Sequence, residues 1–214
     1  MLGRIVKAVL IGLGIYAGAQ LVLRLLRRLY PFPVPPLLAP LLQNPFWNVG
    51  QTRQLLVQDL GLCAGMKVLE VGAGPGHITA EVARALGPEG QLTAIDAQPQ
   101  MVARLAAKLR RQSVESVHVQ AADPRDLPFA NETFDMAYLV TVLGAIADRG
   151  RALRELRRVL KPNGRLAIIE SVADPDYMVM IEVVGWAQAV GFELVEQKGS
   201  GLLYTLVFRS MFGS

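Results

Sequence analysis

Three carboxylates and three closely spaced glycines are the residues of this sequence whose types and positions suit ligand binding. Glu70 lies inside the hydrophobic segment KVLEV, two residues before Gly72. Asp96 ends a second hydrophobic segment, and Asp123 directly follows a third. Because a carboxylate within an apolar strand is costly unless it is paired, Glu70 predicts a partner with an ammonium group or with backbone N–H groups.

The spacing of the glycines separates the possible kinds of nucleotide site. Gly72, Gly74 and Gly76 occupy the first, third and fifth positions of the loop, whereas dinucleotide sites place glycine at the first, third and sixth. His77 stands at the sixth position, and the Gly-Lys-Ser or Gly-Lys-Thr ending of a phosphate loop is absent. The pattern predicts close backbone contact with a ligand that lacks a pyrophosphate, and it disfavours an oxidoreductase.

The three acids suggest one ligand when they are taken in series. An acid that closes the second strand can accept hydrogen bonds from both hydroxyls of a ribose, and Asp123 can accept one from an exocyclic amine. Glu70 could meet the ammonium group of an amino-acid moiety. A ligand that has an amino-acid moiety, a ribose and an adenine in this order is S-adenosylmethionine. Simpler roles stay open: backbone amides could satisfy Glu70, Asp96 could cap the helix that begins at Pro99, and Asp123 could cap a turn.

The elements that must position these residues alternate between predicted strands and helices. Such alternation is typical of parallel βαβ units with right-handed crossovers. The last two strands are joined only by GSG, which is too short for a crossover, so they predict an antiparallel hairpin at the sheet edge. Strands are predicted at 67–71, 90–96, 117–122, 134–140, 165–171, 192–198 and 202–210, and helices at 49–61, 77–86, 99–111, 148–159 and 177–190.

Residues 48–210 resemble the class I S-adenosylmethionine-dependent methyltransferases. VLEVGAGPG resembles the first motif of that family and AID its second-strand acid; AADPRDLPFANETFD and LRELRRVLKPNGRLAIIES resemble two later motifs, in the usual order. Ala122 and Asn163 replace usual glycines, and asparagine tolerates a left-handed backbone. The resemblance implies a Rossmann-like α/β fold, a seven-stranded sheet in the order 3-2-1-4-5-7-6 with strand 7 antiparallel, which agrees with the predicted hairpin.

The same resemblance assigns residues to parts of the cofactor. The first motif would line the methionine and ribose side, Asp96 would hold the ribose hydroxyls, and the residues after the third strand would meet the adenine edge. The end of the fourth strand would face the reacting centre. The implied cofactor-binding residues are Glu70, Gly72, Ala73, Gly74, Gly76, Asp96, Ala97, Met101, Asp123, Pro124 and Val140.

No acid or base for catalysis is predicted. Methyl transfer from a sulfonium depends largely on positioning, and a base is needed only if the acceptor loses a proton. His77 and His118 are the only histidines; His118 lies inside a predicted strand, which indicates a structural role. Tyr138 is expected in the sheet core, although its hydroxyl could donate a hydrogen bond. The segment VTVLGAI after the fourth strand predicts an apolar acceptor pocket.

The N-terminal segment predicts contact with a membrane. Residues 8–23 carry no charge, and Lys7 and Arg24 flank them. Sixteen residues of helix span about 24 Å, slightly less than a hydrocarbon core of ~30 Å, and the flanking side chains can lengthen the span by snorkelling. A single spanning helix within residues 1–28 is the preferred interpretation; a helix lying in the interface and a cleaved signal peptide are the alternatives.

Charge and proline content divide the chain further. Six basic residues precede the first acidic residue, Asp59, so the net charge of +4 comes from the N-terminal part, and the remainder is slightly acidic. This disfavours nucleic acid as a partner, and the arginines after the apolar run place the C-terminal domain in the cytoplasm.

Residues 29–47 contain six prolines and predict a strap over a membrane or cleft, or else a plain spacer. The methyltransferase domain is predicted to follow, at residues 48–214.

The predicted substrate is a small lipophilic acceptor. The apolar pocket and the predicted anchor favour a quinone, a lipid or another lipophilic metabolite reached from the bilayer. The rival function is a non-catalytic module that binds S-adenosylmethionine or recruits a partner to the membrane.

Cys63 is the only cysteine, so the sequence predicts no zinc cluster and no disulfide framework.

Overall fold

The computed structural model describes residues 50–211 together with six residues nearer the N-terminus. Those six residues have helical backbone: Val6, Lys7, Ile11, Gly14, Gly18 and Val22. The rest of the predicted anchor and strap, residues 1–47, lies outside the described part. Within the described part, no helix has both the length and the apolar character needed to cross a bilayer. The spanning helix therefore stays a prediction.

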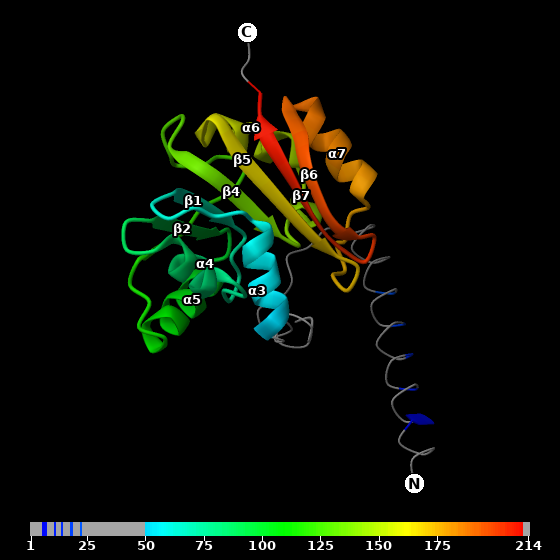
Figure 1. The fold of residues 1–214 in the computed structure, drawn as a ribbon. Coiled ribbons are helices and arrows are strands. Elements are labelled where there is room, and N and C mark those ends of the chain that lie inside the picture. Colours follow the sequence, from blue (N-terminus) through cyan, green and yellow to red (C-terminus); the bar gives the residue numbers. More distant parts are fainter. Residues whose placement is uncertain are drawn as a thin grey trace.

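A seven-stranded sheet forms the centre of the domain, in the order β3-β2-β1-β4-β5-β7-β6 (Figure 1). Only β7 runs antiparallel to its neighbours, β5 and β6. This confirms the predicted sheet order and the terminal hairpin. The strands are β1 (Lys67–Val71), β2 (Gln91–Asp96), β3 (Val117–Ala121), β4 (Phe134–Val140), β5 (Leu160–Ser171), β6 (Phe192–Ser200) and β7 (Leu203–Ser210).

Helices cover both faces of the sheet. One face packs against α3 (Gly50–Asp59), α4 (Thr79–Leu86) and α5 (Pro99–Arg111), and the other against α6 (Arg149–Val159) and α7 (Met180–Ala189) (Figure 1). A short 3-10 helix, η2 (Leu143–Ala145), follows β4. Because both faces are covered, β1 and β4 are nearly continuous hydrophobic runs, which explains why Tyr138 is fully buried as predicted.

The sequence of α6 shows how these helices form. Ala152, Leu153, Leu156 and Val159 recur at helical spacing and are all buried. Asp148 precedes the helix, and its side chain accepts a hydrogen bond of 2.9 Å from the N–H of Arg151. An apolar stripe and a capping acid thus fix both the orientation and the start of α6.

Several predicted boundaries were wrong, each for a local reason. Helix α4 begins at Thr79 and not at His77, because the glycine loop continues with Gly76 at a φ of +75°. Helix α3 ends at Asp59, before Gly61 adopts a φ of +59°. Strand β5 begins at Leu160, which pairs with Phe134, and not at Arg165.

Helix α7 also starts later than predicted. The backbone N–H of Tyr177 bonds to the carbonyl of Asp174, so the chain is still turning where a helix was expected. The helix begins at Met180. The loop between β5 and α7 is therefore longer than the sequence indicates, and it lies at the same edge of the sheet as the predicted site.

Candidate functional site

The carboxyl ends of three neighbouring strands bring the predicted acids to one edge of the sheet. Glu70 is the penultimate residue of β1, Asp96 is the last residue of β2, and Asp123 lies two residues after β3. Strand β2 pairs with both β1 and β3 in parallel register. Ligands of open α/β sheets bind at this edge, so the placement agrees with a shared crevice.

Asp96 connects the glycine loop to the start of α5. Its Oδ2 accepts a hydrogen bond of 2.9 Å from the N–H of Gly74, and its Oδ1 accepts one of 2.8 Å from the N–H of Gln98. Burial raises the pKa of the carboxyl group, although both hydrogen bonds oppose the rise. Gln98 is the N-cap of α5, so Asp96 supports the turn before the helix and does not cap the helix itself.

The glycine loop has a backbone that other residues would not adopt without strain. Gly72, Gly74 and Gly76 have φ values of +68°, +53° and +75°. A Cβ on Gly72 would lie 2.5 Å from Val142, and one on Gly76 would lie 2.4 Å from Leu105. A Cβ on Gly74 would meet no atom within 4 Å. The loop is thus packed against the protein at both ends and open in the middle.

Glu70 lies beneath this loop as a buried carboxyl group. It is 4% exposed, and its Oε2 has no hydrogen-bond partner. Burial raises its pKa to about 7, even though the nearby hydroxyls of Thr79 and Tyr138 and the ammonium of Lys108 lower it. Neither hydroxyl reaches hydrogen-bonding geometry. An orphaned acid oxygen beside an open backbone fits a cationic ligand group, which is what the cofactor's amino-acid end supplies.

Sequence reasoning missed two of the groups around Glu70. Thr79, the first residue of α4, is fully buried, and its hydroxyl has no partner. Lys108, from α5, donates a hydrogen bond to the carbonyl of Gly76. Nothing in the local sequence of Lys108 indicates this contact, because 32 residues separate it from the glycine loop.

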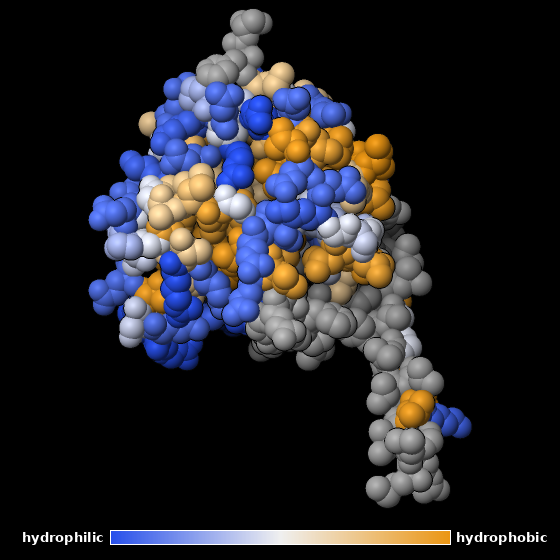
Figure 2. Space-filling model, viewed as in Figure 1, coloured by the Kyte–Doolittle hydropathy of each residue, from blue (hydrophilic) through white to orange (hydrophobic). Residues whose placement is uncertain are grey.

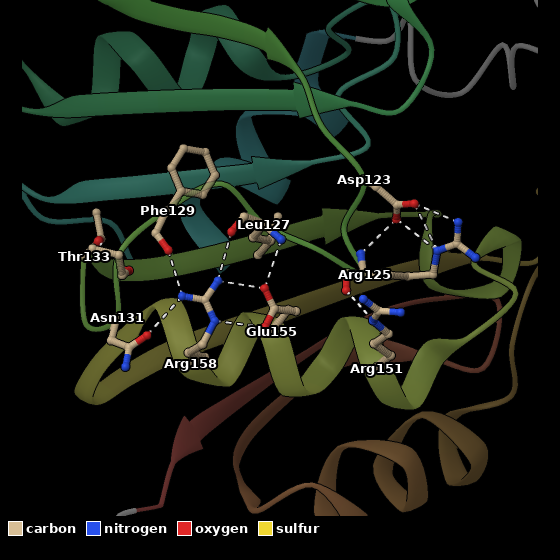
Figure 3. Close-up of polar contacts among 10 residues, drawn as sticks. Asp123, Arg125, Leu127, Phe129, Asn131, Thr133, Arg151, Glu155 and Arg158 are labelled. Atoms are coloured by element: carbon tan, nitrogen blue, oxygen red, sulfur yellow. Dashed lines mark hydrogen bonds and ion pairs between the residues drawn. The ribbon is translucent and has the colours of Figure 1, made fainter.

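Asp123 pairs with a neighbouring arginine in the structure. Its carboxylate accepts hydrogen bonds from the Arg125 guanidinium, the shortest at 2.7 Å, and from the Arg125 backbone N–H at 2.9 Å (Figure 3). The hydrogen bonds from Arg125 hold the pKa of Asp123 below its ordinary value. The turn-capping role that the sequence left open is thus present, and a contact with adenine stays a prediction.

The loop after β3 is fastened to α6 by a second cluster (Figure 3). Arg158 donates to the carbonyls of Leu127 and Phe129, at 2.9 and 2.7 Å. Glu155 accepts from Arg158 at 2.7 Å and from the N–H of Leu127 at 2.9 Å. Arg151 donates to the carbonyl of Arg125 at 2.7 Å. Helix α6 therefore positions the segment that contains Asp123.

Replacing Arg158 with leucine is expected to loosen this loop. Two backbone carbonyls and Glu155 would each lose a donor, which should lower the free energy of unfolding by about 1 to 2 kcal/mol, since the side chain is partly exposed. Hydrogen exchange of the amide of Leu127 should accelerate, while that of β1 should not. Arg84→Leu, which replaces an exposed arginine of α4 outside this cluster, serves as the control. Equal exchange in the two variants would contradict the role given to Arg158.

The remaining predicted residues lie at the same edge but differ in exposure. Ala73 and Met101 are buried, Pro124 and Val140 are partly buried, and Ala97 is exposed. After Val140, Thr141 adopts a φ of +53°, and its N–H bonds to the carbonyl of Ile169. A left-handed backbone is unusual for a β-branched residue and often marks a functional position.

The two histidines give no strong base. Burial, followed by the positive charges of Lys108 and Arg53, lowers the pKa of His77 to about 4, so its imidazole is neutral and weakly basic at physiological pH. His118 is exposed on β3 and bonds to Gln120. Its predicted place inside a strand is confirmed, and its structural role stays a prediction.

A second buried acid, which sequence reasoning also missed, is the penultimate residue of β5. Glu170 is 1% exposed, and neither carboxyl oxygen has a hydrogen-bond partner. Burial, with a contribution from Asp174, raises its pKa to about 9, so the group is neutral at physiological pH. The sequence did contain a signal for Glu170, because the acid lies within the hydrophobic segment RLAIIES. The same kind of signal singled out Glu70.

The sheet order, the glycine loop and the acids resemble those of a class I S-adenosylmethionine-dependent methyltransferase domain. Residues 68–164 match the family model described as a methyltransferase domain. The cofactor of this class is S-adenosylmethionine, and the orphaned Glu70 oxygen and the open Gly74 fit it.

Particular relatives are similar over part of the chain. The ubiquinone/menaquinone biosynthesis C-methyltransferase UbiE of Idiomarina loihiensis is 39% identical over 111 residues, which are 51% of this chain and 44% of that protein. UbiE of Shewanella sediminis is 31% identical over 149 residues, 69% of this chain and 58% of that protein. The chain thus spans about half the length of the curated relatives it matches.

Solved structures share the fold at lower identity. A SAM-dependent methyltransferase from Aquifex aeolicus superposes with a TM-score of 0.75 at 23% identity, covering 84% of this chain and all of that one. The [4+2]-cyclase SpnF superposes with a TM-score of 0.66 at 21% identity, covering 76% of this chain and 82% of that one. At these identities the likeness shows the fold alone.

Proposed function

We propose that this protein transfers a methyl group from S-adenosylmethionine to a small lipophilic acceptor. The observation that supports the proposal most is the arrangement at the edge of β1 and β2. There Asp96 bonds to Gly74, and the unpartnered oxygen of Glu70 lies beneath the same loop. A ligand with a ribose and a cationic amino-acid end would use both carboxylates.

Each residue then has a defined task. Glu70 receives the cationic end, Asp96 accepts from the ribose hydroxyls, and Asp123 with Pro124 faces the adenine edge. The loop of Gly72, Ala73, Gly74 and Gly76 lines the middle of the cofactor, Ala97 and Met101 pack beside the adenosine, and Val140 faces the reacting centre. S-adenosylmethionine, when bound, supplies the activated methyl group. The chain itself orients the reactants and excludes water.

A quinone-type ring is the acceptor that we propose. The curated relatives are named as C-methyltransferases of ubiquinone and menaquinone biosynthesis. The segment after β4 is apolar and includes the buried residues Leu143 and Ile146. An aromatic ring with a lipophilic tail suits such surroundings, because the ring and tail gain stability by leaving water.

We propose further that residues 1–28 anchor the protein in a membrane and that residues 29–47 connect the anchor to the domain of residues 48–214. The uncharged run and its basic flanks support this arrangement. The larger number of arginines after the run supports a cytoplasmic location of the domain. A lipophilic acceptor would then be available in the same bilayer.

The test is cofactor binding together with methyl transfer, with Asp96→Ala as the central variant. Loss of an ionised acceptor should weaken the binding of S-adenosylmethionine about 30-fold, or ~2 kcal/mol, in calorimetry. Glu89→Ala, an exposed acid in a turn, should bind like the wild type. Radiolabelled methyl donor should transfer its label to a menaquinol that lacks the ring methyl group. Absence of donor binding by the wild type would overturn the proposal.

The second function that we propose is cofactor binding without methyl transfer. The [4+2]-cyclase SpnF has the same fold, so the fold does not by itself determine the reaction. Tight donor binding with no label entering quinols, lipids or proteins from fractionated membranes would select this function. The intact set of acids and glycines favours the transferase.

A further inference from the structure

Helix α7 is apolar on the side that faces solvent as well as on the side that faces the core. Its sequence, MIEVVGWAQA, contains one charged residue, Glu182. Val183 and Ala187 are buried against the sheet, while Ile181 is 77% exposed and Trp186 is 42% exposed. A surface helix normally presents polar residues outward, so α7 departs from the usual pattern.

The exposed apolar residues continue to the edge of the sheet that contains the cofactor site. Val179, just before α7, is 46% exposed, and Leu202, in the turn between β6 and β7, is 66% exposed. Two hydrogen bonds hold this turn near the end of β5 and the start of α7: Tyr177 Oη donates to the carbonyl of Gly201 at 2.6 Å, and the N–H of Val172 donates to the carbonyl of Leu202 at 2.8 Å. We call Val179, Ile181, Trp186 and Leu202 the α7 face.

Hydrophobic side chains gather over α7 in the space-filling view, beside a mainly hydrophilic surface (Figure 2). Apolar side chains scattered singly over a protein surface need no explanation, but several on neighbouring segments indicate an interaction site. The α7 face is of this second kind, since α7, the residue before it and one adjoining turn supply all four residues.

One basic residue, Arg154, borders the α7 face on the side of α6. A Cβ on Gly150 would lie 3.4 Å from the guanidinium of Arg154 and 3.6 Å from the ring of Trp186, so these two side chains are neighbours. Arg154 is exposed. Tryptophan beside arginine is typical of segments at a membrane interface, where the ring lies among headgroups and the guanidinium meets phosphates.

We propose that the α7 face binds the interfacial layer of a lipid bilayer. The bordering Arg154 complements anionic headgroups, and the 49 residues that precede the described domain include the uncharged run with its basic flanks. The inference rests on the proposed function in one respect: a lipophilic acceptor must pass from the bilayer to the carboxyl edge of the sheet. With the α7 face on the membrane, that edge lies next to the lipid, and the acceptor avoids water.

The test uses Trp186 as a reporter in the full chain. Trp47 is the only other tryptophan, so Trp47→Phe leaves a single tryptophan, which can be excited selectively. The protein is reconstituted with vesicles of phosphatidylcholine and phosphatidylglycerol, with or without bromine on the acyl chains. Brominated lipid should quench Trp186 by about half, because an interfacial ring lies within reach of the upper acyl chains. Water-soluble acrylamide should quench it weakly.

Two variants at the face provide the matched comparison. Ile181→Lys should restore most of the fluorescence, whereas Ile181→Leu should retain the quenching. Strong acrylamide quenching without bromine quenching would overturn the proposal. Loss of both kinds of quenching, with a dimer in sedimentation, would assign the face to a second copy of the chain.

Calorimetry with S-adenosylmethionine separates this inference from the proposed function. Both Ile181 variants should bind the donor as the wild type does, since the α7 face contains none of the proposed cofactor residues. If brominated lipid quenches Trp186 but the wild type binds no donor, the proposal that the α7 face binds the bilayer is supported and the methyltransferase proposal fails. If the donor binds but Trp186 is not quenched, only the membrane surface fails.

Discussion

Replacing Gly72 with alanine is expected to lower the free energy of unfolding by about 2 to 5 kcal/mol. Two costs combine. An alanine at a φ of +68° adopts a left-handed backbone, which costs about 1 to 2 kcal/mol. Its Cβ would also lie 2.5 and 2.6 Å from the two methyl groups of Val142, and relieving such an overlap typically costs about 1 to 3 kcal/mol.

Gly74→Ala is the matched control for this experiment, because alanine at position 74 would have the backbone cost but not the overlap cost. Gly74 has a φ of +53°, but a Cβ there meets no atom within 4 Å. Urea unfolding should therefore show a loss of about 1 to 2 kcal/mol for Gly74→Ala, well below the loss for Gly72→Ala. Equal losses in the two variants would show that Val142 moves aside easily and that the loop is not packed as described.

The second large effect is a dependence of stability on pH that arises from Glu70. Burial raises its pKa from 4.5 to about 7 in the folded protein, so the folded state retains the proton longer than the unfolded state. Glu70 thus costs no stability below pH 4.5. As the pH rises to about 7, the folded protein should lose about 3 kcal/mol of stability through this one group.

Glu70→Gln is expected to remove that loss, because the amide carries no charge at any pH. Chemical unfolding at pH 5 and pH 8 should show a difference between wild type and variant that grows with pH by most of the about 3 kcal/mol. Glu170, whose pKa burial raises to about 9, is present in both proteins, and its effect cancels in the difference. Glu193→Gln, an exposed acid on β6, is the control and should follow the wild type. Parallel curves for wild type and Glu70→Gln would rule out the burial effect.

Much of the fold was predictable because local signals and long-range order agree. Pro99 suits the first turn of a helix, and α5 begins there and ends at Arg111 as predicted. The GSG link allowed only a hairpin, and β6 and β7 form one. Prediction failed where a glycine or a turn extends a loop, as at Gly76 before α4 and at Tyr177 before α7. Such turns depend on contacts that the local sequence does not reveal.

The candidate site was predictable in its acids and less so in their partners. Alternation of strands and helices was enough to place Glu70, Asp96 and Asp123 at one edge. The partner of Asp96 in the loop, Gly74, is 22 residues away, and the arginine that fastens the loop after β3, Arg158, is 31 residues from Leu127. Contacts at these separations follow from how the helices pack on the sheet, so they emerge only when the whole fold is known.

The reversed direction of β7 has a practical consequence for work with this protein. Ser210, the last residue of β7, pairs with Phe192 at the start of β6, so the chain leaves the sheet at the edge opposite the acids (Figure 1). A reporter or an affinity handle fused there would project away from the cofactor crevice. Immobilisation on a sensor chip through that handle should leave the crevice and the α7 face free to meet ligands and vesicles.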